Sequence, residues 1–270
     1  MRPCWLQRSA LALLLGPWVI AGLNWSAWWW LMGAVTAFAF MAVWLCVPDV
    51  QPLSAPTHHR DSTDAWPKRL ALTLKSPGPW LVSLTFAVYS SQWLAVVGFL
   101  PTVYAELGLT AGMAGVLSAC VALANVSGNI MSGRLLQRGW PAQRLLSIGF
   151  ACMTLGAVGA YATWQGEGLP TSLRFACVVM FSAVGGLIPG TLFSCALRLA
   201  PSEGTVSTTV GYMQQLSALG QFAGPPVVAW VAASAGGWQW TWAVTATLSL
   251  AGAVLAHFIG RALHKKEKHD

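Results

Sequence analysis

The chain has 270 residues, of which 56% are hydrophobic and only 9% carry a charged side chain. Soluble domains have about 25% charged residues, so composition excludes a soluble globular fold. The formal net charge is +7, but the basic residues flank long uncharged runs, where anionic headgroups attract them. Nucleic acid is therefore not an expected partner, and the apolar runs predict an all-α, polytopic membrane protein.

Eight apolar runs are candidates to cross the bilayer as helices, which need about 20 residues each. In chain order they are residues 9–23, 26–47, 80–100, 111–131, 145–161, 175–197, 207–233 and 240–259. The first run is short and follows Arg2 and Arg8, so a secretory signal is the alternative interpretation. No small-residue cleavage site precedes the next apolar run, which favours a span.

These spans divide the chain into four parts. Residues 1–47 hold two spans, residues 48–79 form a polar linker, residues 80–260 hold six spans and residues 261–270 form a basic tail. The next-to-last run is too long for one straight span. Its Gly224-Pro225-Pro226 sequence is predicted to bend or break the helix, because proline removes a backbone donor and clashes with the preceding turn.

The basic residues predict the orientation. All but one of the 15 Lys and Arg residues fall in the termini and in loops on one side of the eight-span arrangement, and only Arg174 falls on the other side. Loops rich in Lys and Arg face the cytoplasm. We therefore expect both termini in the cytoplasm, and a bacterial inner membrane as the location.

The start and the end of the chain share an internal repeat. The Gly16-Pro17 pair recurs at Gly224-Pro225, and an Ala-Val-Thr-Ala tetrad at 34–37 recurs at 243–246 with nearly the same spacing. The repeating unit holds six spans, and an even number gives both copies the same orientation, as in a parallel transporter repeat. Two complete units need twelve helices, so we expect this chain to hold helices five to twelve, with four more before Met1.

These features resemble the major facilitator superfamily of secondary transporters, whose two six-helix halves are joined by a long basic cytoplasmic loop. The resemblance covers essentially the whole chain and is carried by residues 211–226, residues 99–115 and the segment Gly133-Arg134-Leu135-Leu136-Gln137-Arg138-Gly139. It implies an incomplete fold with a complete C-terminal six-helix half. The last segment is similar to the family's gating loop, which assigns Gly133, Arg134 and Arg138 to gating. Residues 99–115, at the predicted outer turn, loosely resemble the cyanate and nitroimidazole branch.

Uncharged polar side chains are the candidate substrate ligands, because no Asp, Glu, Lys or Arg lies inside a predicted span. An amide in hydrocarbon costs several kcal/mol without a partner, so each must face protein, water or substrate. The candidates are Tyr89, Gln92, Asn125, Asn129, Gln214, Gln215 and Gln221.

Packing is the alternative role for each of these side chains. Asn125 and Asn129 share one helix face beside a stripe of small residues (Cys120, Ala124, Gly128 and Ser132), and for them helix packing is the leading interpretation. Gln214 and Gln221 share another helix face with Ser217. For this face, helix packing and a position in a cavity are equally favoured interpretations. For Tyr89 and Gln92 the resemblance favours a substrate role, since helix seven lines the cavity in this family.

The resemblance implies transport of a small organic solute by alternating access, with the lipid bilayer and the solute as partners. No motif of an enzyme, cofactor or metal site is present, so none is expected. Coupling to protons would use a carboxylate in the missing helices, or Glu106 or Glu167 at the outer mouth. The alternatives are a non-transporting fragment that needs a partner chain and an eight-helix channel that pairs symmetrically. Because helices five and six normally pack in a half that is otherwise absent here, we expect weak packing of residues 9–47 relative to the last six spans.

Overall fold

The computed structural model describes residue 16, residues 19–20, residues 22–46 and residues 65–268. Long α-helices dominate this part of the chain, and seven helical segments in it are long and apolar enough to cross a membrane. The predicted all-α, polytopic membrane fold is confirmed. The predicted first span, residues 9–23, lies almost entirely outside the described residues, as does Pro17.

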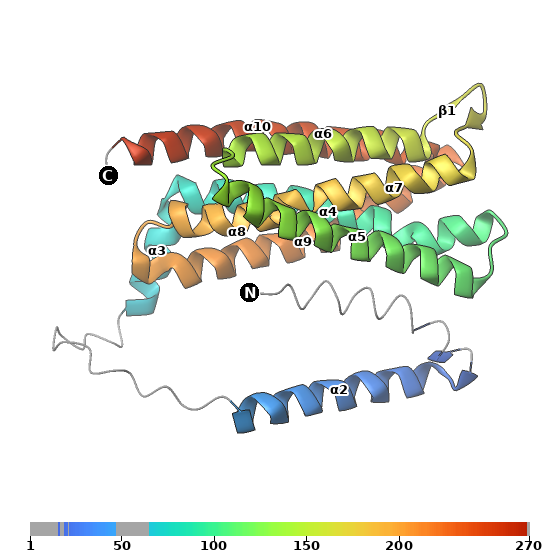
Figure 1. Cartoon of the computed structure of the whole chain (residues 1–270), viewed down its shortest axis with the longest axis horizontal. Helices are drawn as coiled ribbons and strands as arrows, with labels where there is room; N and C mark the ends of the chain where they lie inside the picture. The colour runs from blue at the N-terminus through green and yellow to red at the C-terminus, as the bar shows by residue number, and fades with distance from the viewer. Residues whose placement is uncertain (1–15, 17–18, 21, 47–64, 269–270) are drawn as a thin grey trace.

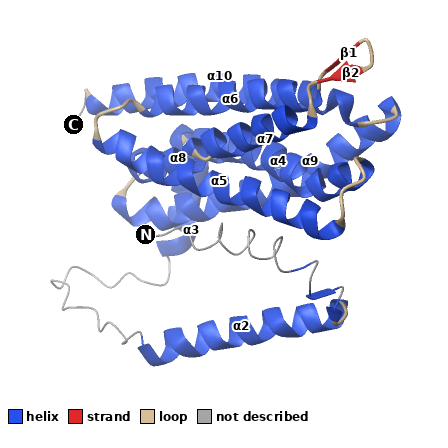
Figure 2. Ribbon diagram, turned by 45° about the vertical axis from the view of Figure 1, so that its right-hand side comes forward, coloured by secondary structure: helices blue, strands red, loops and turns tan. Residues whose placement is uncertain are grey.

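The helix α2 (Trp25–Cys46) lies apart from the other helices (Figures 1 and 2), and none of its residues is buried. Large apolar side chains such as Trp30 and Phe38 are exposed along it. Gly16 lies against the ring of Trp28. The weak packing predicted for residues 9–47 is confirmed for this helix, because no other described helix covers its apolar surface.

The predicted linker, residues 48–79, contains helical structure from residue 65 onward, and residues 47–64 are not described. A short helix, α3 (Ala65–Lys75), forms here, and α4 (Pro77–Glu106) begins directly after it. Proline suits the first helical turn because its missing N–H has no partner there. Thr73 of α3 is fully buried, whereas Trp66, two turns earlier on the same side of the helix, is exposed.

Six membrane-spanning segments then form one bundle, which Figure 1 shows side on. After α4 come α5 (Ala111–Gln137), α6 (Ala142–Tyr161), β1 (Thr163–Trp164), β2 (Glu167–Gly168), α7 (Thr171–Gly185), α8 (Leu187–Leu199), η1 (Glu203–Thr205), α9 (Val206–Ala235), η2 (Trp238–Trp240) and α10 (Thr241–Glu267). The helix α4 is the most buried span and contacts α5, α8, α9 and α10, while α6 pairs with α10. The core therefore sits around α4.

The bundle has two distinct ends. We call the end with the β1–β2 hairpin the hairpin end, and the end with α3 and the C-terminus the tail end (Figure 1). The strands pair antiparallel through Thr163 with Gly168 and Trp164 with Glu167. Arg134 and Lys266 lie in the last turns of α5 and α10 at the tail end, whereas Arg174 lies in the first turn of α7 at the hairpin end.

Two helices continue through internal prolines. The helix α9 runs unbroken through Pro225 and Pro226, so of the predicted bend or break the break is wrong. The helix α4 passes through Pro101 to Glu106, beyond the predicted end of its span at residue 100, and the turn at residues 107–110, where Gly108 has φ +79°, lies within the predicted outer turn. Packing of the flanking turns retains the helix although each proline removes one backbone donor.

The span predicted as one helix over 175–197 consists of two helices, α7 and α8, that meet at Gly186. Pro189 has no N–H to donate to the carbonyl of Gly185, so the backbone hydrogen-bond ladder is interrupted at this point. An added Cβ at Gly186 would collide with the carbonyl of Asn125. The junction therefore brings the backbone of α7–α8 close to α5.

Candidate functional site

Midway along α4, one turn carries the sequence Tyr89-Ser90-Ser91-Gln92-Trp93, which we call the α4 polar turn. All five residues are buried. Four of their side chains take part in hydrogen bonds to four different helices, namely α5, α7, α9 and α10. In a bilayer such bonds hold helices together because lipid offers no alternative partner. This turn is therefore the polar centre of the bundle.

Asn125 of α5 joins three helices through this turn. It is fully buried, and its Nδ2 donates to the hydroxyl of Tyr89 at 2.9 Å and to the carbonyl of Ser182 in α7 at 2.8 Å. Its Oδ1 accepts a hydrogen bond from Nδ2 of Asn129 at 3.1 Å. Trp93 Nε1 donates to Oγ of the same Ser182 at 3.1 Å. The donors and the acceptor of Asn125 all have partners within the chain.

Gln92 and Ser90 connect the α4 polar turn to the remaining two helices. Gln92 is fully buried; its Oε1 accepts from Ser249 Oγ of α10 at 3.0 Å, and its Nε2 donates to the carbonyl of Val88 at 3.3 Å. Ser90 Oγ donates to the carbonyl of Ser217 in α9 at 3.0 Å. Gln92 therefore faces α10, away from the Tyr89–Asn125 pair.

The glutamines of α9 have a different environment. Gln214 and Gln221, which we call the α9 flank, are both exposed and share one helix face. Gln221 Nε2 donates to Ser217 Oγ at 3.2 Å, whereas Gln214 has no hydrogen-bond partner among the described residues. Two amide side chains of a membrane-spanning helix are thus left on an open face.

Gln215, one position farther round α9, lies away from this flank. It lines a groove of about 690 Å³ at the tail end between α3 and α9, together with Trp66, Leu70 and Tyr212. The candidate residues of α9 are therefore divided between two surfaces.

The predicted stripe of small residues on α5 is only partly a packing face. Gly128 and Ser132 are buried, and an added Cβ at Gly128 would collide with the backbone of Ala183 in α7. Cys120, the member of the stripe nearest the hairpin end, is exposed. Asn125 and Gly128 together bring α5 close to the α7–α8 junction, and Asn129 lies half-buried beside them.

The predicted gating loop lies at the tail end. The helix α5 ends at Gln137, and the N–H of Arg138 donates to the carbonyls of Arg134 and Leu135, both at 3.1 Å. Gly139 follows with φ +83°, a left-handed conformation that only glycine adopts at no steric cost. Gly133 lines a groove of about 790 Å³ here between the ends of α5, α8 and α10.

The sequence did not predict Ser182, whose carbonyl accepts from Asn125, or Ser249, whose hydroxyl donates to Gln92. A hydroxyl in a span bonds its own helix just as readily, as Thr85 does to the carbonyl of Leu81 at 2.6 Å. No pattern in the sequence therefore separates a bridging serine from a local one. Among the described residues, no cluster of His, Cys, Asp or Glu could hold a metal ion.

A bundle of apolar helices joined at mid-membrane depth by side-chain hydrogen bonds defines a polytopic integral membrane protein. Residues 9–219 match the family described as the Major Facilitator Superfamily, and the chain belongs to that family. A comparison with curated proteins finds no match.

The fold is also similar to a crystal structure described as a bacterial homologue of the human lysosomal transporter Spinster, in an inward-facing and unoccupied conformation. The TM-score is 0.66 at 15% identity, and the match covers 98% of this chain and 66% of that one. The chain therefore spans about two thirds of the length of the solved transporter.

Proposed function

We propose that the chain is part of a secondary transporter that moves a small organic solute across a bacterial inner membrane by alternating access. The observation that carries this proposal is the α9 flank. Gln221 lies near the middle of a 30-residue helix, exposed on the surface of the bundle. An amide facing hydrocarbon costs several kcal/mol, so this face requires water, substrate or other protein against it.

In this proposal the candidate residues have two roles. Asn129, Gln214 and Gln221 are accessible and contact the solute. Tyr89, Gln92 and Asn125, whose polar groups are taken by neighbouring helices, position the walls of the site. Substrate contacts made by few polar groups in an otherwise apolar surface are typical of small-molecule sites.

The opposite wall of the site would come from helices beyond those described. We propose that the chain corresponds to helices five to twelve of a twelve-helix transporter. The 66% coverage of the Spinster homologue supports this correspondence. The distribution of Lys and Arg supports a cytoplasmic tail end and cytoplasmic termini. Proton coupling, if present, would then use Glu106 or Glu167 at the hairpin end, or a carboxylate in the further helices.

Cysteine accessibility tests this site directly. In a cysteine-free background, Gln221→Cys should react with a membrane-impermeant thiol reagent at least tenfold faster than Phe222→Cys, its neighbour on α9. Both side chains are exposed, but only the glutamine is proposed to face an aqueous cavity. Equal rates in native membranes would contradict a central site at this position.

A second candidate is a membrane fragment that does not transport and needs a partner chain. The absence of any buried residue in α2 favours it, because a helix without a packing partner gains little from tertiary structure. Intact mass and N-terminal sequencing of the protein from its native host distinguish the two. A product with about four further spans supports the transporter, and a product that starts at Met1 supports the fragment.

A further inference from the structure

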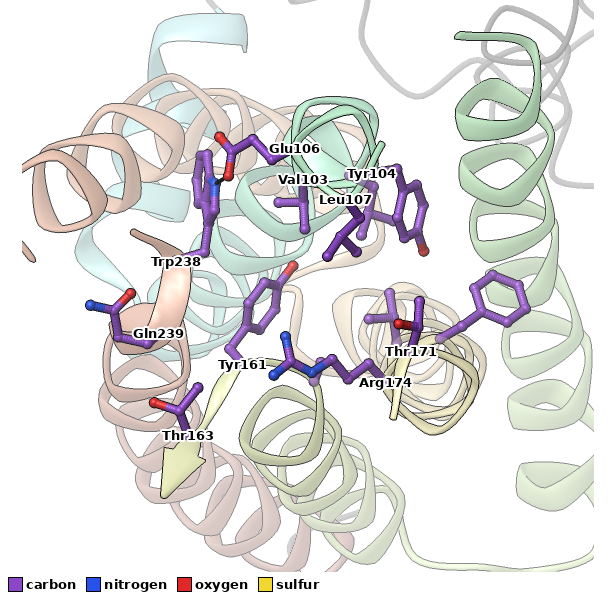
Figure 3. A pocket seen from close by; sticks show the side chains of 14 residues that line it. Val103, Tyr104, Glu106, Leu107, Tyr161, Thr163, Thr171, Arg174, Trp238 and Gln239 are labelled. Atoms are coloured by element: carbon purple, nitrogen blue, oxygen red, sulfur yellow. Dashed lines mark hydrogen bonds between the residues drawn. The ribbon is translucent and has the colours of Figure 1, made fainter. Parts of the chain in front are cut away.

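A separate pocket of about 180 Å³ lies at the hairpin end, within the six-span bundle (Figure 3). It is enclosed by the end of α4, the end of α6, the start of α7 and η2. None of the residues proposed above for the central site lines it. Pockets for drug-sized ligands measure about 300–1,000 Å³, so a ligand here must be small.

Arg174 supplies a positive charge to this pocket. It is half-buried, and its Nε donates to the carbonyl of Leu169 at 2.8 Å. Within the described part of the chain it makes no ion pair, and its terminal nitrogens have no hydrogen-bond partner. A guanidinium presents donors in a planar fork that matches a carboxylate. Arg174 is therefore available to bind an anion.

The backbone of the hairpin determines where this guanidinium lies. An added Cβ at Gly168 of β2 would collide with Arg174 Nη2 and lie 2.6 Å from its Cζ. Glycine at this position therefore allows the arginine to cross the strand. This contact gives a way to displace the charge without removing it.

Two tyrosines line the same pocket. Tyr104 is 5% exposed, and its buried hydroxyl has no hydrogen-bond partner among the described residues. Figure 3 shows the hydroxyl of Tyr161 pointing toward Leu107, close to Arg174, and the hydroxyl of Tyr104 pointing toward the α7 side. A buried hydroxyl without a partner is costly, and a bound acceptor would remove that cost.

Most of the remaining lining is apolar; the other polar residues are Thr163, Thr171, Gln239 and the acidic Glu106. Leu100, Val103, Phe175 and Val178 form the apolar surface. Glu106 accepts a hydrogen bond from Trp238 Nε1 at 3.0 Å and lies across the pocket from Arg174 in Figure 3. A second negative charge on a ligand would meet this carboxylate, so the pocket favours a ligand with a single charge at one end.

We propose that this pocket binds a small organic monocarboxylate with an apolar body. The carboxylate pairs with Arg174 and accepts from the tyrosine hydroxyls, and the body lies against the apolar wall. The pocket shares Glu106 with the proposed proton coupling but contains none of the residues proposed to contact the transported solute. It can exist whether or not the α9 flank binds a solute.

Fluorine NMR titration of the purified full chain in detergent tests the proposal. The probe is 3-(4-fluorophenyl)propionate, and the matched control is its primary amide, which has nearly the same shape but no charge. We expect saturable binding of the acid and at least tenfold weaker binding of the amide. Equal affinities, or no saturable binding of the acid, would overturn the proposal.

Variants locate the binding at Arg174. Arg174→Gln and Gly168→Ala should each weaken binding of the acid at least tenfold, the second by displacing the guanidinium. Arg174→Lys should bind the acid with intermediate affinity, because lysine keeps the charge but lacks the planar fork of donors. Arg261→Gln removes the same charge at the tail end and should bind as the wild type does. Circular dichroism and size-exclusion profiles confirm that each variant is folded. Wild-type affinity in a folded Arg174→Gln variant would refute the site.

Discussion

The α4 polar turn and the α9 flank contain similar side chains in opposite environments. Gln92 is fully buried with both ends of its amide hydrogen-bonded, whereas Gln214 is exposed and has no partner among the described residues. Both residues lie within membrane-spanning helices. Where the chain supplies partners, an amide joins helices; where it does not, the amide identifies a surface that something else must cover.

This difference has a consequence for mutagenesis. Substitutions in the α4 polar turn and at its contacts should change stability, whereas substitutions in the α9 flank should leave stability nearly unchanged. The four predictions below test that distinction, and the expected loss of stability decreases from the first to the last.

The largest effect is expected at Gly224, where α9 approaches the α4 polar turn. An added Cβ there would collide with the carbonyl of Ser91. Overpacking of this kind costs about 1–3 kcal/mol, and we expect Gly224→Ala to lower the free energy of unfolding in mixed micelles by about 2 kcal/mol. Gly211→Ala on the same helix is the control, because nothing lies within 4 Å of its added Cβ. Equal effects of both variants would contradict the close contact.

Asn125→Leu should have the next largest effect. It removes the bonds to Tyr89, Ser182 and Asn129. Side-chain hydrogen bonds in membranes contribute about 0.6 kcal/mol on average and up to about 1.7, so the expected loss is about 1.5 kcal/mol by the same unfolding measurement. A loss no larger than that of Asn129→Leu, which lies half-buried at the edge of the network, would show that Asn125 is not its centre.

Tyr89→Phe should have a smaller effect, about 0.6 kcal/mol. Asn125 loses one acceptor but keeps the carbonyl of Ser182. In the double variant with Asn125→Leu the two losses should not add, because both substitutions remove the same bond. Full additivity in this double-mutant cycle would exclude the hydrogen bond between the two side chains.

Gln214→Leu and Gln221→Leu should have the smallest effect, within about 0.5 kcal/mol of the wild type, as is usual for surface positions. Phe222→Leu, on the exposed side of α9, serves as the comparison. A loss above about 1 kcal/mol in either glutamine variant would identify the flank as a packing face and would remove the main support for a central site there.

Much of the fold was predictable because hydrophobic runs of bilayer length have few structural solutions. The positions of the six spans from residue 80 onward agree with the helices α4 to α10. The errors lie where tertiary packing competes with local signals. The helix α9 continues through Pro225 and Pro226, where a bend or a break was predicted, and Pro189 interrupts a span predicted to be continuous.

The candidate site was predictable only as a set of residues. Polar side chains inside apolar runs are visible in any sequence, and all seven candidates were found in this way. Ser182 and Ser249 were not found as partners, because they look like any other serine within a span. The anion pocket at Arg174 was also missed, since its lining comes from the ends of several elements that are distant in sequence.

The sequence by itself determined that this is a membrane protein of packed helices, where its spans lie and which polar residues they contain. Those properties depend on the composition and length of each run, which are local. Only the tertiary structure decided which amides are satisfied, as at Asn125, and which have no partner among the described residues, as at Gln214. That distinction depends on which helices are neighbours and how closely glycines such as Gly224 allow them to approach.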